Sequence, residues 1–407
     1  MRSVLSRNRV KGALPAAVAP DGARPGGGRL RSLDGLRGVA ALVVVFHHSF
    51  LTGPILADVN TGAVPASVHS WYWWVSYTPL HLIWAGPEAV YVFFVLSGFV
   101  LVLPTESPRF RWASYYPRRL LRLYLPVVAA VLFAWLTVLL VPTRVIPGAS
   151  AWLNQHHLDI TVGRVLHDMA LIRGVSLLDG PLWSLKWEVI FSLLLPLFVV
   201  TARVLPRALW LKAIILLGLV GFGGHVVQSE GVFYLPIFGL GVLLAVHRER
   251  FKQLAAALSR QAWIALSAFA LLGLTATWTG EAILRESAPR SEFVVIEVLA
   301  AALIVFVFAY GRNARRFAET RVIQWLGAIS FSLYLVHEPI IVSTALLLGG
   351  HASPLLTLVI AVTASLAIAH LFFRWVEGPS HRISQTVGRR IDASLSVRAV
   401  EPLAAEM

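Results

Sequence analysis

Long apolar stretches, separated by short charged segments, constrain this chain more than any other feature of its sequence. Ten of them approach the roughly 20 residues that an α-helix needs to cross the hydrocarbon core of a bilayer. The short alternating segments of a β-barrel are absent. With 57% hydrophobic and only 14% charged residues, the chain is predicted to be an all-α, polytopic membrane helix bundle. The predicted transmembrane helices lie at 36–56, 82–104, 120–141, 183–203, 207–228, 231–247, 262–280, 293–311, 324–348 and 354–376.

The distribution of Lys and Arg predicts the orientation of the bundle. If the helices alternate across the membrane, all but six of the 35 Lys and Arg residues fall on the side that holds both termini. Because cytoplasmic loops are enriched in Lys and Arg, we expect a multi-pass protein of the cell membrane with cytoplasmic N- and C-termini. The same bias accounts for the net charge of +14, so no nucleic-acid partner is expected. The six exceptions are Arg144, Arg164, Arg173, Lys186, Arg285 and Arg290.

The chain divides into one membrane domain between two tails. Residues 1–30 are rich in Arg, Ala, Pro and Gly and contain no apolar run that could serve as a signal peptide, so they are predicted to be a disordered cytoplasmic tail. Residues 31–382 form the predicted transmembrane domain, and 383–407 a second cytoplasmic tail. The absence of cysteine excludes disulfides, thiolate metal sites and a cysteine nucleophile.

The first predicted helix carries two adjacent histidines into the bilayer. Ionisable groups at that depth are rare and mark functional sites. On a continuous helix, Asp34, Arg37 and His48 share one face, whereas His47 is turned about 100° away. Eleven residues separate Arg37 from His48, which corresponds to about 16 Å at 1.5 Å per residue. The two side chains therefore lie too far apart for a hydrogen bond.

Arg37 and His48 suit different chemical tasks. An arginine at the cytoplasmic mouth can bind an anion such as phosphate, and an imidazole at mid-bilayer can accept a proton from a hydroxyl. The alternatives are an ordinary positively charged membrane anchor for Arg37 and a packed polar residue for His48. Asp34, just before the apolar run, is predicted to cap the helix start.

Two long outer connections, 52–81 and 141–182, contain clustered aromatic residues. The first holds Trp71, Tyr72, Trp73 and Trp74, and the second holds Trp152 together with His156, His157 and His167. Tryptophans commonly anchor a protein at the membrane interface. An aromatic platform for a sugar or another acceptor is the alternative interpretation.

Further motifs recur in later helices. Small residues such as Ser97 and Gly98 favour close helix contacts in a membrane. Arg119 and Arg122 fall on one helical face with Arg118 beside them. The motifs are Val92–Phe99 (VFFVLSGF), Arg118–Arg122 with Pro126, Pro181–Glu188 (PLWSLKWE) with Pro196, Gly327–His337 with Pro339, and Glu377–Pro379.

Taken with Ser32–Ala41 and His48, these motifs make a set of six that resembles acyltransferase family 3 in content and order. Members of that family are multi-pass membrane O-acyltransferases that act on glycans, on lipid-linked or secreted polymers, and on macrolide-type antibiotics. The resemblance covers about residues 31–382. The chain departs from the family pattern at Lys186, Ser192, Phe331 and Glu338, positions that fall on or around the acceptor side.

The resemblance implies an enzyme that moves a short acyl group, with acetyl as the first candidate, from acyl-coenzyme A to a hydroxyl. Acyl-CoA is then a co-substrate, the acceptor is a glycan, glycoconjugate or natural product, and no metal is expected. His48 is predicted as the general base, with Glu188 as a second catalytic residue that orients a hydroxyl or holds an imidazole. A salt bridge from Glu188 to Lys186 is the competing interpretation. The predicted donor phosphate ligands are Arg37, Arg118, Arg119 and Arg122.

A second group of residues is predicted to support substrate or structure. Ser97 is interpreted first as a packing residue, with an acyl-serine intermediate as the lesser alternative. For Tyr334 and His337, three apart on one helix, structural hydrogen bonding is favoured over catalysis. Glu188 and His337 are the candidate partners of His48. The support residues are Asp34, Ser97, Trp183, Ser184, Tyr334 and His337.

Two other functions compete with the enzyme. A transporter or flippase of a glycan or small polar molecule could use the same buried histidine and arginine for recognition. The long inverted repeats that would favour transport are not seen in the sequence. A noncatalytic sensor on the same scaffold is the third possibility. The sequence predicts a lipid bilayer as surroundings and specifies no oligomeric state.

Overall fold

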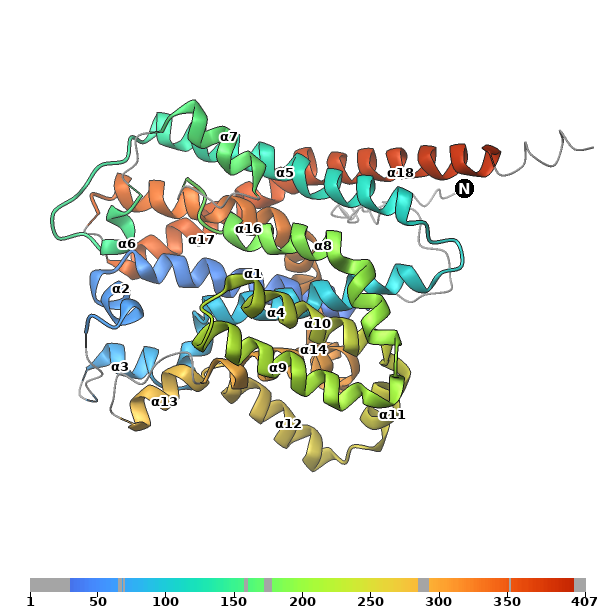
Figure 1. Cartoon of the computed structure of the whole chain (residues 1–407). Helices are drawn as coiled ribbons and strands as arrows, with labels where there is room; N and C mark the ends of the chain where they lie inside the picture. The colour runs from blue at the N-terminus through green and yellow to red at the C-terminus, as the bar shows by residue number, and fades with distance from the viewer. Residues whose placement is uncertain are drawn as a thin grey trace, which may run out of the picture. The chain divides into compact units, whose positions relative to one another are not determined.

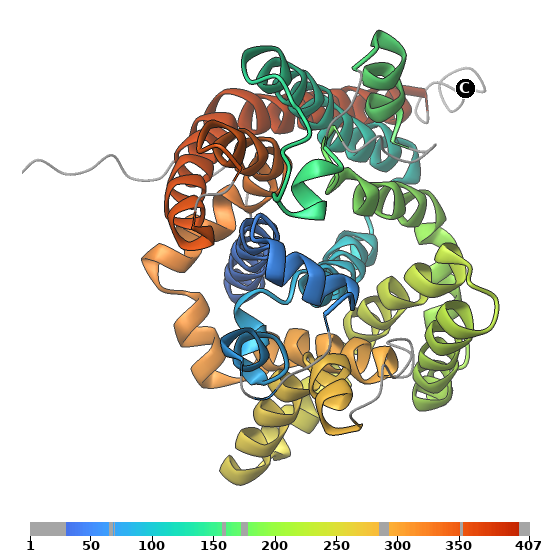
Figure 2. The same cartoon turned by 90° about the vertical axis from the view of Figure 1, so that its left-hand side faces the viewer.

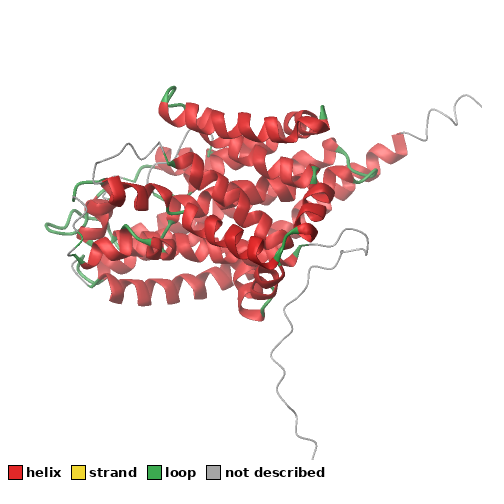
Figure 3. Cartoon of the chain, turned by 90° about the horizontal axis from the view of Figure 1, so that it is seen from below, coloured by secondary structure: helices red, strands yellow, loops and turns green. Residues whose placement is uncertain are grey.

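The computed structural model describes residues 30–64, 68, 70–156, 160–171, 178–284, 293–350 and 353–398. Within these ranges the chain is helical and contains no β-strand (Figure 1, Figure 3). The predicted all-α class is therefore confirmed for the described residues. The predicted N-terminal tail, 1–30, lies outside them except for its last residue.

Ten helices carry most of the apolar sequence, and each coincides with one of the ten predicted membrane segments. They are α1 (Arg31–Leu51), α4 (Gly86–Val102), α5 (Trp112–Leu140), α8 (Leu182–Arg203), α9 (Leu209–His225), α10 (Glu230–Val246), α12 (Arg260–Gly273), α14 (Val294–Tyr310), α16 (Arg321–Leu347) and α17 (Pro354–Phe372).

Shorter helices connect or extend these ten. They are α2 (Pro54–Thr61), α3 (Trp71–Ser76), η1 (Pro79–Ile83), η2 (Leu103–Glu106), α6 (Ala151–Asn154), α7 (Val162–Ala170), η3 (Pro206–Ala208), α11 (Arg248–Ala257), α13 (Ala276–Leu284), α15 (Arg312–Ala318), η4 (Phe373–Glu377) and α18 (Gly378–Arg398).

Length and composition qualify six helical segments of the described chain as membrane spans. Four bent helix pairs, α1 with α2, α10 with α11, α12 with α13, and α14 with α15, raise the number to as many as ten if each pair is one span. Each bend places the shorter member at a steep angle, between 75° and 109°. The chain is thus a multi-pass membrane protein.

Helix α1 occupies the middle of the bundle, where α16, α4 and α17 pack against it (Figure 2). Its contact with α16 is unusually close because both helices present glycine. A Cβ on Gly38 would overlap the backbone of Gly327, and one on Gly327 would overlap the carbonyl of Asp34. Small residues allow this close approach of membrane helices. The contact fixes the two helices that carry His48 and His337.

The connection between α5 and α8 does not stay at the membrane surface. The hydroxyl of Tyr334, near the midpoint of α16, donates to the carbonyl of Pro181 at 3.2 Å. The backbone N–H of Gly180 donates to Glu338 on the same helix at 3.0 Å. Helix α8 therefore begins inside the bundle, and the end of the predicted outer connection 141–182 reaches the middle of α16.

The chain remains helical beyond the predicted end of the membrane domain at residue 382. Helices α17 and α18 are joined through the π-helical turn η4, so that residues Leu355–Leu395 run as one segment of 41 residues. Helix α18 packs along α5 (Figure 1). Residues 383–398 of the predicted tail thus belong to an ordered helix that contacts the bundle.

Candidate functional site

The two adjacent histidines of α1 diverge, as the helical geometry predicts. His47 is buried and its Nδ1–H donates to the carbonyl of Trp84 at 2.9 Å. His48 instead faces α16, and 17% of its side chain is exposed. The ring of Trp152, from α6, lies nearly parallel to the His48 ring with centroids 5.6 Å apart. Trp152, for which a position at the membrane interface was one interpretation, therefore lines the site beside His48.

A chain of hydrogen bonds fixes the tautomer of His48. Nδ1 of His337 lies 2.9 Å from the carbonyl of Tyr334 and 3.1 Å from that of Leu333. Since a carbonyl only accepts, His337 carries its proton on Nδ1 and presents a lone pair at Nε2. That Nε2 is 2.8 Å from Nδ1 of His48, which must therefore donate. The lone pair of His48 is left on Nε2, so the structure supplies His48 with a partner, His337, that the sequence offered only as a candidate.

Glu338 adds a carboxylate to this group. One of its oxygens lies 3.6 Å from Nδ1 of His48. The other accepts from Nε2 of His156 at 2.9 Å and from the backbone N–H of Gly180 at 3.0 Å. We call His48, His156, His337 and Glu338 the histidine cluster; it joins α1, the end of α6 and α16.

His156 carries a positive charge in this arrangement. Its Nδ1 is 2.8 Å from the carbonyl of Trp152 and its Nε2 faces the Glu338 carboxylate. Burial lowers the pKa of His156, but the hydrogen bond and the charge of Glu338 outweigh burial and raise that pKa above its ordinary value. Asp179 lies nearby, and its burial, followed by the charges of Glu338 and Asp168, raises its pKa well above the ordinary value. These influences favour the neutral form of the Asp179 carboxyl beside the Glu338–His156 pair.

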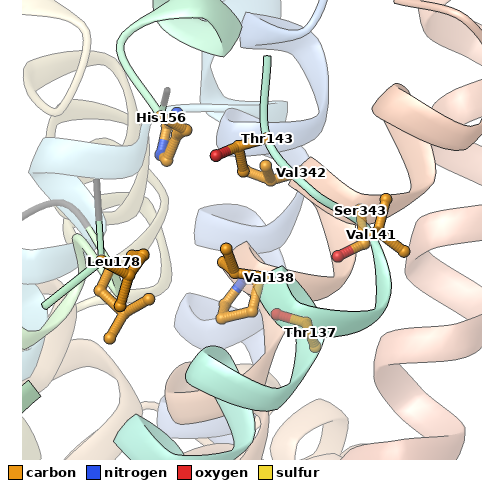
Figure 4. A pocket seen from close by; sticks show the side chains of 10 residues that line it. Thr137, Val138, Val141, Thr143, His156, Leu178, Val342 and Ser343 are labelled. Atoms are coloured by element: carbon orange, nitrogen blue, oxygen red, sulfur yellow. The ribbon is translucent and has the colours of Figure 1, made fainter. Parts of the chain in front are cut away.

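A pocket opens on the side of His156 (Figure 4). It encloses about 330 Å³ of empty space, part of it open to solvent. Apolar side chains and the hydroxyls of Thr137, Thr143 and Ser343 line it. Of the histidine cluster, His156 is the member that lines this pocket.

Tyr334 lies one turn below His337 and contacts the start of α8. Its hydroxyl is 2.7 Å from Oγ of Ser184 and donates to the carbonyl of Pro181. These bonds tie the middle of α16 to the start of α8. Trp183 points elsewhere, towards Phe94 and Tyr234, with ring centroids 6.3 and 5.1 Å away.

A second polar group lies on the cytoplasmic side of the bundle, by the predicted orientation. Nη2 of Arg119 is 2.5 Å from Oε1 of Glu188. The same carboxylate oxygen accepts from Oγ of Ser97 at 3.2 Å, and Arg119 also donates to Ser192 at 3.0 Å. Glu188 is therefore held by Arg119 and not by an imidazole, which corrects the expectation that it could partner His48. Lys186 pairs with Glu230 at 3.2 Å, so the alternative salt bridge to Glu188 is also wrong.

Arg37 and Arg122 complete this group. Each lies close enough to Glu188 and Glu377 to interact electrostatically with both carboxylates. Glu377, on η4, accepts a hydrogen bond from Ser332 of α16 at 2.6 Å. We call Arg37, Arg119, Arg122, Glu188 and Glu377 the arginine cluster. Three guanidinium groups from two helices thus converge with only two carboxylates.

Two residues predicted for this region have other surroundings. Arg118 turns to α18, where its Nη2 is 3.1 Å from the carboxylate of Asp392. Successive side chains on an α-helix point about 100° apart, so Arg118 points away from its neighbour Arg119. Asp34 lies within the first turn of α1, since that helix already begins at Arg31. The predicted cap position is therefore wrong, although a carboxylate still lies near the positive end of the helix dipole.

Sequence reasoning missed the contributions of Glu338, His156 and Ser332. Glu338 was treated as a departure from the family pattern, although a carboxylate in mid-span is itself a signal of function. His156 gave no comparable signal, because it lies in a long connection that only the fold brings to α16. Among the described residues, no group of three or more His, Asp or Glu side chains could hold a metal ion.

Comparison with known proteins assigns the chain to a family. Residues 30–374 match the acyltransferase family 3 domain, described as an acyltransferase domain, and the chain belongs to this family. It is therefore a membrane acyltransferase, which requires an acyl donor and a hydroxyl acceptor. Among curated proteins it is similar to the acyltransferase MdmB of Streptomyces mycarofaciens, with 25% identity over 377 residues, 86% of this chain and 89% of that protein. No solved structure gives a significant match.

Proposed function

We propose that the protein transfers a short acyl group, with acetyl as the first candidate, from acyl-CoA to a hydroxyl of a glycan, glycoconjugate or macrolide-like acceptor. His48 acts as the general base. The observation that carries this proposal is the hydrogen-bond chain from the carbonyls of Leu333 and Tyr334 through His337, which leaves the lone pair of His48 on Nε2. A base needs an accessible lone pair, and 17% of the His48 side chain is exposed.

The arginine cluster is proposed to hold the phosphates of the donor. Guanidinium groups bind phosphate oxygens through two parallel hydrogen bonds. Helix α1 runs unbroken from Arg31 to Leu51, so Arg37 and His48 lie about 16 Å apart along it. One extended donor can then place its phosphates at Arg37, Arg119 and Arg122 and its thioester at His48. With both termini in the cytoplasm, as proposed, the phosphate end is the cytoplasmic one, where CoA is made.

The reaction proceeds by direct attack. Nε2 of His48 takes the proton of the acceptor hydroxyl while that oxygen bonds to the thioester carbonyl carbon. The C–S bond then breaks, and the CoA thiolate takes the proton from the imidazolium, so that an ester and free CoA leave. Ser97 is engaged by Glu188 at 3.2 Å in the arginine cluster, which argues against an acyl-serine intermediate.

Free CoA provides a clean measure of turnover. The chain has no cysteine, so in the purified protein a thiol reagent detects only the CoA released. The protein in detergent is given acetyl-CoA and a panel of hydroxyl acceptors, macrolides and oligosaccharides among them. We expect acceptor-dependent release of CoA that falls about 10²- to 10⁴-fold in His48→Ala.

His47→Asn is the matched control. Asparagine retains an N–H that can donate to the carbonyl of Trp84, and His47 has no role in the proposed transfer. We expect this variant to retain wild-type turnover within a fewfold. Unchanged turnover in His48→Ala, or an equal loss in both variants, would contradict the assignment of the base.

A further inference from the structure

We infer that His156 keeps His48 neutral by neutralising Glu338, and that Glu338 stabilises the imidazolium that forms on His48 during transfer. Both are positioning residues, and the inference rests on the proposed role of His48. It assigns a function to His156, which lies outside the motifs shared with the family.

The geometry gives the two oxygens of Glu338 different tasks. Oε1 is occupied by Nε2 of His156 at 2.9 Å and by the N–H of Gly180 at 3.0 Å. Oε2 remains directed at Nδ1 of His48, 3.6 Å away. The carboxylate is only 4% exposed, so water does not screen its field.

An unbalanced carboxylate at this distance would disable a general base. Opposite charge within about 4–6 Å favours the charged form of an imidazole by about 1–3 pH units. The field of Glu338 alone favours the imidazolium form of His48, which has no lone pair to accept a proton, and burial alone would have to oppose it. His156, protonated on both nitrogens because both face acceptors, cancels most of that field in the resting state.

Four other titratable residues, His47, His337, Asp179 and Asp168, lie around His48 and its two partners. His47 lies on the same helix with its Nδ1–H on the Trp84 carbonyl, and His337 on α16 accepts from His48. For Asp179, before α8, burial and then nearby carboxylates raise the pKa and favour the neutral form. Asp168, on α7, lies 3.3 Å from His167. Glu338 and His156 are therefore the charged pair closest to His48 in the described chain.

The substitution His156→Gln tests the effect of the positive charge of His156 separately from its hydrogen bond to Glu338. The glutamine amide N–H can occupy the position of Nε2–H and keep the bond to Glu338, but it carries no charge. We expect CoA release at pH 7 to fall about tenfold or more. Because protonation of His48 causes the loss, raising the pH restores activity, and the pH–rate profile moves about 1–3 units to higher pH. His48→Ala protein measures the background hydrolysis of the thioester at each pH.

Two further variants, Glu338→Gln and His156→Gln/Glu338→Gln, complete a double-mutant cycle with His156→Gln. Glu338→Gln alone lowers kcat without recovery at high pH, because no carboxylate then stabilises the imidazolium that forms on His48. His156→Gln/Glu338→Gln removes both charges, so we expect it to be more active at pH 7 than His156→Gln. A purely structural pair can give the same order of activities, because loss of one buried partner costs more than loss of both. The shift of the pH–rate profile in His156→Gln therefore separates the electrostatic role from a structural one.

His167→Gln is the matched control, because it makes the same change in the same outer connection away from His48. It should leave the pH–rate profile in place. An unshifted profile in His156→Gln, or a double variant no more active than His156→Gln, overturns the inference. Failure of the proposed function is distinguishable, because the wild-type protein would then show no turnover that depends on His48.

Discussion

Arg118 and Arg122 lie four residues apart on α5, and the structure predicts opposite consequences for replacing them with glutamine. Arg118 is bound to Asp392 of α18, and both side chains are about one-third exposed. Such an ion pair contributes about 0–1 kcal/mol to stability. Arg122 belongs to the arginine cluster, beside Arg37 and Arg119, and the residue retains exposed surface.

The expected magnitudes differ accordingly. A hydrogen bond to a charged group is worth about 1.5–3 kcal/mol, which corresponds to about 10- to 150-fold in affinity at 1.4 kcal/mol per tenfold. Arg122→Gln should raise the KM for acetyl-CoA by this factor with kcat little changed, since the contact is equally present in ground and transition states. Arg118→Gln should leave KM within about twofold of wild type, since its partner is Asp392 and not the donor.

The assay measures initial rates of CoA release against acetyl-CoA concentration at a saturating concentration of acceptor. Thermal denaturation in detergent verifies that both variants are folded. Equal increases in KM for the two variants would show that Arg118 also reaches the donor. An unchanged KM in Arg122→Gln would remove the arginine cluster from the donor site.

Two further predictions concern the packing of the bundle. In Gly98→Val, the new Cβ would lie 2.0 Å from the carbonyl oxygen of Phe238. The substitution should therefore destabilise the contact of α4 with α10 by about 1–3 kcal/mol and lower the thermal denaturation temperature. An unaltered temperature would show that the two helices can move apart without cost. Tyr334→Phe removes the bonds to Ser184 and Pro181 and should cost about 0.6–1.7 kcal/mol, the range for hydrogen bonds between membrane helices. A steric-trap unfolding measurement in bicelles tests the second value, and a loss above about 3 kcal/mol would assign Tyr334 a larger structural role.

The sequence predicted the helices well because apolar length and charge placement follow directly from the bilayer. All ten predicted segments correspond to helices, and the divergence of His47 and His48 follows from a rotation of 100° per residue. These predictions needed only local geometry. The orientation of the chain and the roles of the site residues remain predictions.

The partners of the site residues required the tertiary fold. If a transmembrane helix begins at the membrane surface, Glu188 in the second turn of the predicted helix 183–203 lies near that surface and away from Arg119. In the structure α8 begins inside the bundle, so Glu188 lies deep enough to meet Arg119. His156 reaches Glu338 across 182 residues of sequence, and no local pattern reports such a contact.

The π-helical turn η4 has a consequence for the register of the C-terminal helix. A π-turn contains one residue more than an α-turn, so every side chain after it is rotated by about 100° relative to an uninterrupted α-helix. That rotation sets the face that α18 presents to α5, including Asp392 opposite Arg118. Deleting a single residue between 373 and 377 would preserve the helix but turn this face away. The extra residue thus determines which side chains of α18 face the membrane bundle. The same turn also places Glu377 where it accepts a hydrogen bond from Ser332.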